Sequence, residues 1–145
     1  MSKRSVIVDG DGGPLGVVIA GANVHGTKLL EQTIDAMIVE RPDPGTHAQH
    51  LALDKGYDHP TGRSTVEKKG CTGRIRRIGE EKVDQRGRKA RPARRWVVER
   101  ALAWLSKRRV ILVCFAKKSC NYLAIIQLAC ILLWFRRLRR RKGAI

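Results

Sequence analysis

The stretch 5-SVIVDGDGGPLGVVIAG-21 has two short runs of β-branched residues on either side of a turn rich in glycine and aspartate. Val and Ile favour extended strands, and glycines supply the positive φ angles that a tight reversal needs. The stretch therefore predicts a β-hairpin at the start of the chain. A glycine-rich phosphate-binding loop is the alternative; against it, no Gly-Lys-Ser/Thr follows and the next segment has a strand-like composition.

Beyond the hairpin, helical and extended patterns alternate. Residues 27–40 place apolar side chains three and four positions apart, which predicts a helix, and the RPDPG that follows predicts its end. The apolar positions of that helix are Leu30, Ile34, Met37 and Ile38. A short apolar run predicts a strand that ends just before Asp54. Residues 64–69 then predict a brief helix, and residues 71–78 predict a further strand.

The second half of the chain is basic and ends in an apolar segment. Residues 79–95 are charged and interrupted by glycine and proline, which predicts an exposed basic loop. A helix follows over residues 94–109, and residues 121–145 predict an apolar helix with a basic tail. The order of elements indicates one domain over residues 1–145, of the α/β or α+β class, with helices packed on a sheet.

Charge is the most unusual property of the composition. The chain has 30 basic and 13 acidic residues, a net charge of +17, and 43% of its residues are hydrophobic, enough for a core. Residues 1–62 hold 5 basic and 8 acidic residues, whereas residues 63–145 hold 25 and 5. A basic half beside a nearly neutral half favours a polyanionic partner, and nucleic acid is favoured over an anionic membrane.

Basic side chains gather just before and around the helix at residues 94–109, and we predict that they contact DNA phosphates. A solvated surface without a ligand is the alternative interpretation. The predicted DNA-binding residues are Arg74, Arg76, Arg77, Arg86, Arg88, Lys89, Arg91, Arg94 and Arg95.

Two acids stand out against this basic background. Asp54 follows a predicted strand, at the position where ligands bind in open α/β sheets; a turn aspartate that bonds its own backbone is the alternative. Glu99 lies at one edge of an apolar helix face, with no Lys or Arg three or four residues later. A helix-edge glutamate paired with Arg95 is the alternative there. Two carboxylates in a basic field suit a divalent cation that handles phosphate, such as Mg²⁺.

Residues 122–135 suggest a rival class, a small basic tail-anchored membrane protein. Only Gln127 is strongly polar in this run, and a basic segment follows it. A membrane span needs about 20 apolar residues, so we expect a buried helix with a basic tail and no membrane. The N-terminus has no signal-peptide pattern and the four cysteines have no zinc-site spacing, so we expect a cytoplasmic, nucleoid-associated protein.

Five segments, in order, resemble the DDE transposases of bacterial insertion sequences, in the branch named for insertion sequence five. They are 3-KRSVIVDGDGGPLGVVIAGANVH-25, 51-LALDKGYD-58, 74-RIRRIGEE-81, 92-PARRWVVERALAWL-105 and 121-NYLAIIQLACILLW-134. The resemblance implies an RNase H-like mixed sheet flanked by helices. It also implies three carboxylates that hold Mg²⁺, with Mn²⁺ as a substitute, for strand cleavage and transfer at the ends of an element. By position, Asp54 matches the second aspartate, Glu99 the glutamate and Arg95 the arginine shortly before it.

The family's first aspartate lies on a strand upstream of the segment that resembles residues 3–25. The resemblance therefore implies a catalytic domain truncated at its N-terminus, which lacks the first catalytic aspartate and is incomplete on its own. An upstream transposase fragment or a second protomer would complete it, on double-stranded DNA that includes element ends and target. A catalytically dead DNA-binding remnant or inhibitor is the alternative function.

Overall fold

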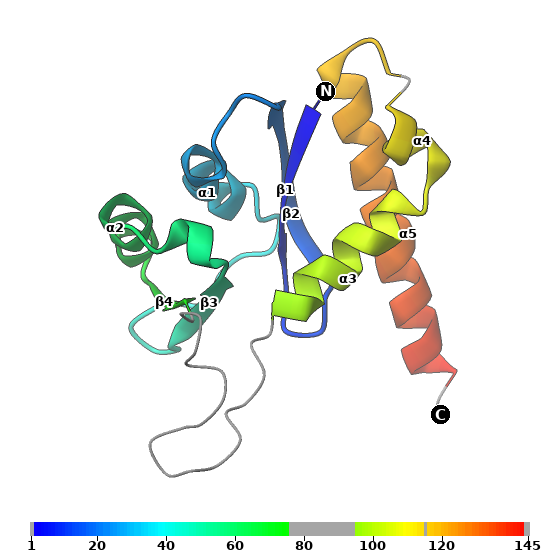
Figure 1. Ribbon diagram of the computed structural model, residues 1–145. Helices are drawn as coiled ribbons and strands as arrows, with labels where there is room; N and C mark the ends of the chain where they lie inside the picture. Colours follow the sequence, from blue (N-terminus) through cyan, green and yellow to red (C-terminus); the bar gives the residue numbers. More distant parts are fainter. Residues whose placement is uncertain (1, 76–94, 115, 144–145) are drawn as a thin grey trace, which may run out of the picture.

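The computed structural model describes residues 2–75, 95–114 and 116–143 (Figure 1). In chain order its elements are β1 (Ser2–Val8), β2 (Pro14–Gly21), α1 (Gly26–Asp35), β3 (Gln49–Leu53), a 3₁₀ helix (Lys55–Tyr57), α2 (Pro60–Lys68), β4 (Cys71–Ile75), α3 (Arg95–Ser106), α4 (Arg109–Val113) and α5 (Ser119–Lys142). The predicted α/β class is therefore confirmed.

The predicted hairpin is confirmed. β1 pairs with β2 antiparallel, from Ser2 opposite Gly21 to Ile7 opposite Gly16. In the turn, the Asp9 Oδ1 atom accepts hydrogen bonds from the backbone amides of Asp11 at 3.0 Å and Gly13 at 2.6 Å. These bonds argue against the phosphate-loop alternative, because they engage amides that a phosphate would need.

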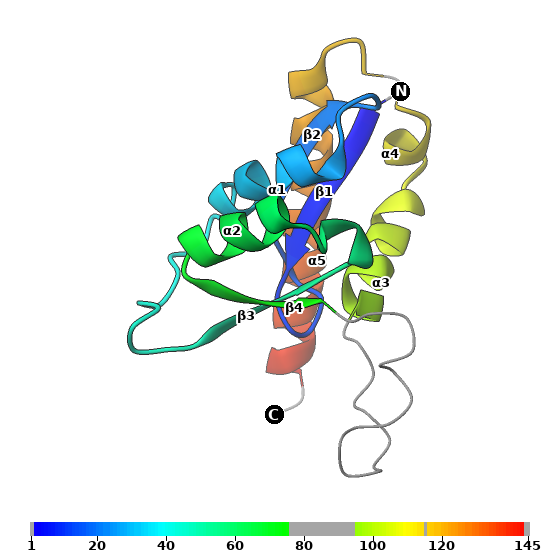
Figure 2. The same cartoon turned by 60° about the vertical axis from the view of Figure 1, so that its left-hand side comes forward.

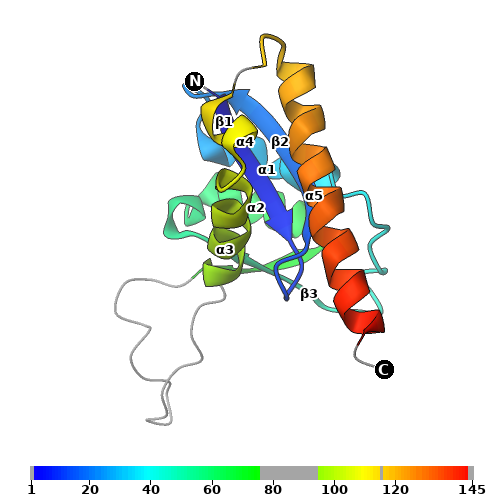
Figure 3. The same cartoon turned by 90° about the vertical axis from the view of Figure 1, so that its right-hand side faces the viewer.

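The hairpin lies between two layers of helices. α1 covers one face, where Leu30 and Ile34 are buried against Ile7 of β1. α3 and α5 cover the other face, and Figure 3 shows them flanking the hairpin. The core on that face contains Val17 of β2, Leu105 of α3 and a stripe of α5 residues. Burying both faces of two adjacent strands is what their high Val and Ile content requires.

A second sheet lies beyond α1. β3 pairs with β4 in parallel, from Gln49 beside Cys71 to Leu53 beside Ile75, and α2 forms the crossover between them. Among the described strands, the two pairs form separate sheets with no hydrogen-bonded ladder between them. The continuous mixed sheet that we predicted is therefore not observed in this part of the chain, and the RNase H-like arrangement stays a prediction.

The first helix ends earlier than its apolar spacing predicts. α1 stops at Asp35 rather than near residue 40, and Ile38 is 85% exposed. The backbone leaves the helix because the Ile38 amide donates to the carbonyl oxygen of Leu15 in β2 at 3.1 Å. The chain passes so close to β2 here that a Cβ at Gly16 would lie 2.7 Å from the carbonyl oxygen of Ala36.

α5 continues as a helix through the basic segment to Lys142, and it is less buried than predicted. Its inner face is buried at Tyr122, Ile126 and Ala129, but its outer face leaves Leu128, Ile131, Leu132, Phe135 and Leu138 exposed. The prediction of a buried helix is therefore wrong for the outer face. By length and composition alone, with a mean hydropathy of 1.4 over its most apolar window, α5 could cross a membrane, but one such helix is weak evidence.

Candidate functional site

Asp54 occupies the end of β3, as predicted, and caps the 3₁₀ helix that follows. Its Oδ1 atom accepts a hydrogen bond from the amide of Lys55 at 2.7 Å, and its side chain is exposed. The interpretation as a turn aspartate that bonds its own backbone is thus confirmed. This geometry does not conflict with a metal-binding role, since an exposed carboxylate at the end of a strand is also open to a ligand.

The pKa of Tyr57 depends in part on the charge of Asp54. Burial of the phenol, together with the negative charge of Asp54, raises the pKa of Tyr57 above its ordinary value of 10.0. The ring also packs against the apolar cluster between α1 and α2. Sequence reasoning did not single out Tyr57, and its place in the turn after Asp54 was the available signal.

Glu99 is exposed on α3, outside the fully buried stripe of the helix. The buried stripe of α3 is narrow and consists of Val97, Ala101 and Leu105, each four residues apart. Glu99 lies about 200° around the helix from Val97, which turns its carboxylate away from the hairpin. Val98 and Leu102 are half-buried beside this stripe, and Leu102 lies one turn after Glu99, so Glu99 stands on the solvent side of the edge of the apolar face.

The two acids come from elements that converge. Figures 1 and 2 show that the C-terminal ends of β3 and β4 point toward the first turns of α3. Within the described residues, however, no three His, Cys, Asp or Glu side chains gather closely enough to hold a metal ion. The described part of the chain thus contains no complete set of three carboxylate ligands.

Most of the predicted phosphate contacts lie outside the described residues. These are Arg76, Arg77, Arg86, Arg88, Lys89, Arg91 and Arg94. Arg74 is exposed on β4, and Arg95 is the first residue of α3 rather than part of a loop. Arg100 was missed: it is exposed on α3 next to Glu99 in sequence, and its guanidinium lies 4.4 Å from the ring centre of Trp96.

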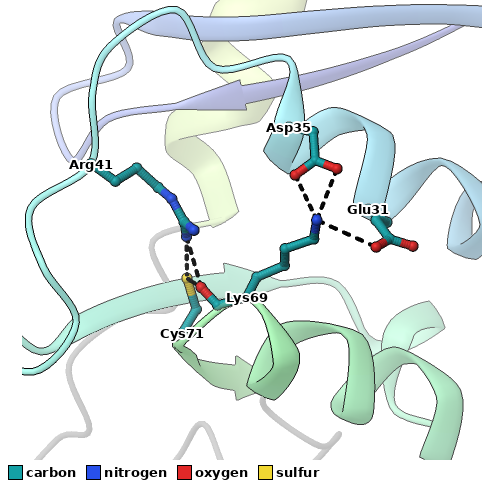
Figure 4. Close-up of polar contacts among 5 residues, drawn as sticks. All are labelled: Glu31, Asp35, Arg41, Lys69 and Cys71. Carbon is teal, nitrogen blue, oxygen red and sulfur yellow. Dashed lines mark hydrogen bonds and ion pairs between the residues drawn. The ribbon is translucent and has the colours of Figure 1, made fainter.

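A cluster of charged side chains fixes the second sheet against α1 (Figure 4). The Lys69 ammonium donates to both carboxylate oxygens of Asp35, at 2.7 and 2.8 Å, and lies 3.3 Å from Glu31. Arg41 donates to the carbonyl oxygen of Lys69 at 2.9 Å and to the Cys71 sulfur at 3.3 Å. These contacts join α1 to the start of β4, and so position the sheet that carries Asp54.

Comparison with known proteins agrees with the resemblance. The family model described as the transposase DDE domain matches residues 1–134. The chain belongs to the DDE transposase family. It is 31% identical over 142 residues to a protein of Burkholderia cepacia that is named as a transposase for insertion sequence element IS402. That alignment covers 96% of this chain, and the chain spans 65% of the relative's length. No solved structure matches the chain significantly.

Membership of the DDE family makes the chemistry of the two acids relevant, because DDE transposases use divalent metal ions bound to carboxylates. Asp54 and Glu99 have the oxygen donors that Mg²⁺ and Mn²⁺ accept. Both are exposed and come from elements that approach each other. The donor set therefore fits part of such a site.

Proposed function

We propose that this chain is part of a DDE transposase catalytic domain that acts on double-stranded DNA, with Asp54 and Glu99 as two of its metal ligands. The observation that carries the proposal is that β3, which Asp54 follows, points toward the first turn of α3, the helix that carries Glu99, in a chain of this family. A bound divalent ion supplies Lewis-acid chemistry for phosphodiester cleavage and strand transfer.

The chain's own part in this function is to bind and orient DNA. Arg74, Arg95 and the basic residues of segment 76–94 would neutralise DNA phosphates. Because counterions are released as phosphates are neutralised, affinity for DNA should fall steeply with salt. The exposed Arg100 guanidinium, stacked on Trp96, extends this surface along α3.

The division of the strands into two sheets supports an incomplete catalytic domain. Ile7 of β1 and both Leu51 and Leu53 of β3 pack around the same apolar cluster, although the two strands do not pair. A further strand between β1 and β3 would join the sheets and satisfy their exposed edges. We infer that this strand, with the third carboxylate, comes from an upstream transposase segment or from a second protomer.

Metal binding tests the proposal without depending on activity. We expect Mn²⁺, followed by electron paramagnetic resonance, to bind the wild-type chain together with a duplex that carries the element end. Asp54→Asn and Glu99→Gln should each weaken this binding about tenfold or more. Glu67→Gln is the matched control, since Glu67 is an exposed acid on α2 outside the proposed site. Equal binding in all four proteins would contradict the assignment.

Nicking of the same duplex with Mg²⁺ or Mn²⁺ then tests catalysis. We expect weak or no nicking by the chain alone, because without the third carboxylate the two metal ions that clamp the attacking and leaving oxygens are not both held in place. Any nicking that is present should disappear in Glu99→Gln and persist in Glu67→Gln. Nicking that survives both Asp54→Asn and Glu99→Gln would show that other residues carry the chemistry.

A DNA-binding remnant without catalysis is the second candidate function. It is favoured by the lack of a third ligand among the described residues. This alternative predicts DNA binding that survives the double substitution Asp54→Asn, Glu99→Gln, and that blocks nicking by a complete transposase of the same element. In either case we expect the protein in the cytoplasm, associated with the nucleoid. Recovery only in detergent would instead favour the tail-anchored alternative.

A further inference from the structure

We propose that the C-terminal end of α5 carries a second phosphate-binding site, formed by Arg136, Arg139 and Arg140, which binds the DNA backbone. This inference rests on the proposed function and adds a surface that is separate from the basic residues before Glu99. It starts from how the basic side chains at the end of α5 divide between two faces of the helix.

One face of the α5 end is used within the fold. Arg137 donates to the carbonyl oxygen of Asp11 at 2.6 Å and lies 3.8 Å from the Asp9 carboxylate. Arg141, one turn later, lies 3.8 Å from the Asp11 carboxylate. These two arginines therefore face the acidic hairpin turn, which partly neutralises their charge and fixes the end of the helix against β1 and β2.

The other face has no such acidic neighbour among the described residues. Arg136, Arg139 and Arg140 are three and four residues apart, so they share one side of the helix, and together they line a shallow hollow. All three are exposed, and no hydrogen bond or ion pair joins them to another described side chain. Three guanidinium groups around one hollow suit an anion with several oxygens, and each can bind a phosphate through two parallel N–H donors.

The hollow is held in place by the core. The Trp134 indole donates to the carbonyl oxygen of Pro14 at 2.8 Å, and Ile126, two turns earlier, is 0% exposed. The basic end is thus the last part of a docked helix and not a free tail. A docked helix binds a ligand with less loss of conformational freedom than a mobile segment does.

The position of the hollow favours DNA as its ligand. Figure 3 shows the end of α5 and the first turn of α3 on either side of the hairpin turn. A Cβ at Gly12, in that turn, would lie 3.2 Å from Val97 of α3 and 3.5 Å from Arg137 of α5. The C-terminal end of α5 and the first turn of α3 therefore lie at the same end of the molecule, and an extended polyanion bound along α3 has the arginines at the end of α5 within the reach of its next phosphates.

Neither the helix dipole nor an anionic membrane accounts for the whole arrangement of these arginines. Cations near a helix C-terminus complement the helix dipole, but the effect is confined to the last turn, and Arg136 lies before that turn. An anionic membrane would also attract arginines. A helix inserted in lipid would also carry arginines at one end, but the inner face of α5 is buried against the hairpin at Tyr122, Ile126 and Ala129, in the cluster that contains Val17.

The test measures how the affinity for a labelled duplex of arbitrary sequence depends on salt, using the full chain. The variant Arg136→Gln, Arg139→Gln, Arg140→Gln should lower the slope of log affinity against log salt by about 0.9 for each phosphate that is no longer neutralised, and the affinity by about tenfold or more at low salt. The matched control, Lys107→Gln, Lys117→Gln, Lys118→Gln, removes three exposed positive charges elsewhere and should change the slope by less than about 1. Arg136→Lys, Arg139→Lys, Arg140→Lys keeps the charge and should retain most of the slope.

The outcomes separate this inference from the proposed function. If the wild-type chain binds DNA and the two glutamine variants lose equal slope, or neither loses any, the α5 site is wrong while DNA binding stands. If the wild-type chain does not bind DNA, both proposals fail. If the α5 variant binds DNA normally but loses binding to vesicles of anionic phospholipid, the surface binds a membrane and the inference is overturned.

Discussion

The backbone amide of Tyr57 donates to the carbonyl oxygen of Asp54 at 3.0 Å, so a half-buried phenol and a candidate metal ligand share one turn. Burial and the Asp54 charge both raise the pKa of Tyr57, because each disfavours the phenolate. This pairing gives the candidate site a titratable reporter that needs no substrate.

We expect Asp54→Asn to lower the pKa of Tyr57 toward 10.0 without reaching it, because burial of the ring remains. Asparagine caps a helix as well as aspartate does, so the turn should persist. The measurement is the ultraviolet absorbance of tyrosinate as the pH rises, with Tyr57→Phe to identify the signal. Asp58→Asn, in the same turn, is the control and should leave the titration unchanged. An unchanged titration in Asp54→Asn would contradict the assigned interaction.

Tyr57 also predicts how stability depends on pH. A group whose pKa is raised by folding contributes stability that is present below its unfolded pKa and is lost as the pH rises through its folded pKa. The contribution of Tyr57 should therefore be complete below pH 10.0 and decline above it. The melting temperatures of the wild-type chain and of Tyr57→Phe should differ below pH 10.0, and the difference should shrink as the pH rises above it. A difference in melting temperature that does not change with pH would show that the phenol of Tyr57 has the same pKa in the folded and the unfolded protein.

Lys69 allows a second test, on the contact between α1 and the β3–β4 sheet. The hydrogen bond from Lys69 to Asp35, with further contributions from Glu31, raises the pKa of Lys69 above 10.5. Its contribution to stability should be complete below that pH and be lost as the pH rises further. We expect Lys69→Met to lower the melting temperature slightly at neutral pH, and less in high salt. Lys68→Met, at the exposed neighbouring position, is the control; an equal effect in both variants would exclude a specific role for the cluster.

Local patterns in the sequence predicted the elements well, but not how the strands join. The glycine-rich turn before Pro14 and the apolar run before Asp54 each contain their own signal, so the hairpin and β3 were predicted correctly. The early end of α1 was missed because it depends on Leu15, which lies more than 20 residues away and accepts the Ile38 amide. Hydrophobic spacing cannot show a backbone hydrogen bond to a distant strand.

In the candidate site, too, features that depend on local sequence were predictable and features that depend on packing were not. Asp54 could be placed from its own surroundings, because a strand end and a capped turn are local features. The orientation of Glu99 could not, since it depends on which stripe of α3 packs against the hairpin. Val97, Ala101 and Leu105 face the hairpin core and are buried, which leaves Glu99 exposed. The sequence also could not show which arginines of α5 face the acidic hairpin turn. This depends on how β1 and β2 place that turn beside Arg137.

The inner face of α5 should dominate the stability of the hairpin core. Ile126 is 0% exposed, and Ile126→Ala should reduce the free energy of unfolding by about 2–5 kcal/mol through lost burial and a residual cavity. Ile131 has the same side chain on the same helix but is 63% exposed, so Ile131→Ala should change stability by about 0.5 kcal/mol or less. Chemical denaturation of both variants measures the contrast. Equal losses would mean that the outer face of α5 is also buried in solution, for example against a second protomer.

The contact between the hairpin turn and α5 permits little extra volume. A Cβ at Gly13 would clash with Cζ2 of the Trp134 ring and lie 2.7 Å from its Cη2 atom and 2.8 Å from the Asp9 carboxylate, so Gly13→Ala should displace the end of α5. We expect a loss of about 1–3 kcal/mol, the usual cost of overpacking, and a change in tryptophan fluorescence.

Adding Trp134→Phe should recover part of the loss from Gly13→Ala, because the smaller ring withdraws the atoms that clash. By itself, Trp134→Phe should cost about 0.5–1.5 kcal/mol, because the hydrogen bond to Pro14 is removed. The double-mutant cycle therefore gives a favourable coupling if the two residues are in contact. Gly56→Ala is the control, since a Cβ there meets nothing within 4 Å. Additive losses would mean that α5 does not rest on the hairpin turn, which would also remove the fixed orientation required by its phosphate-binding hollow.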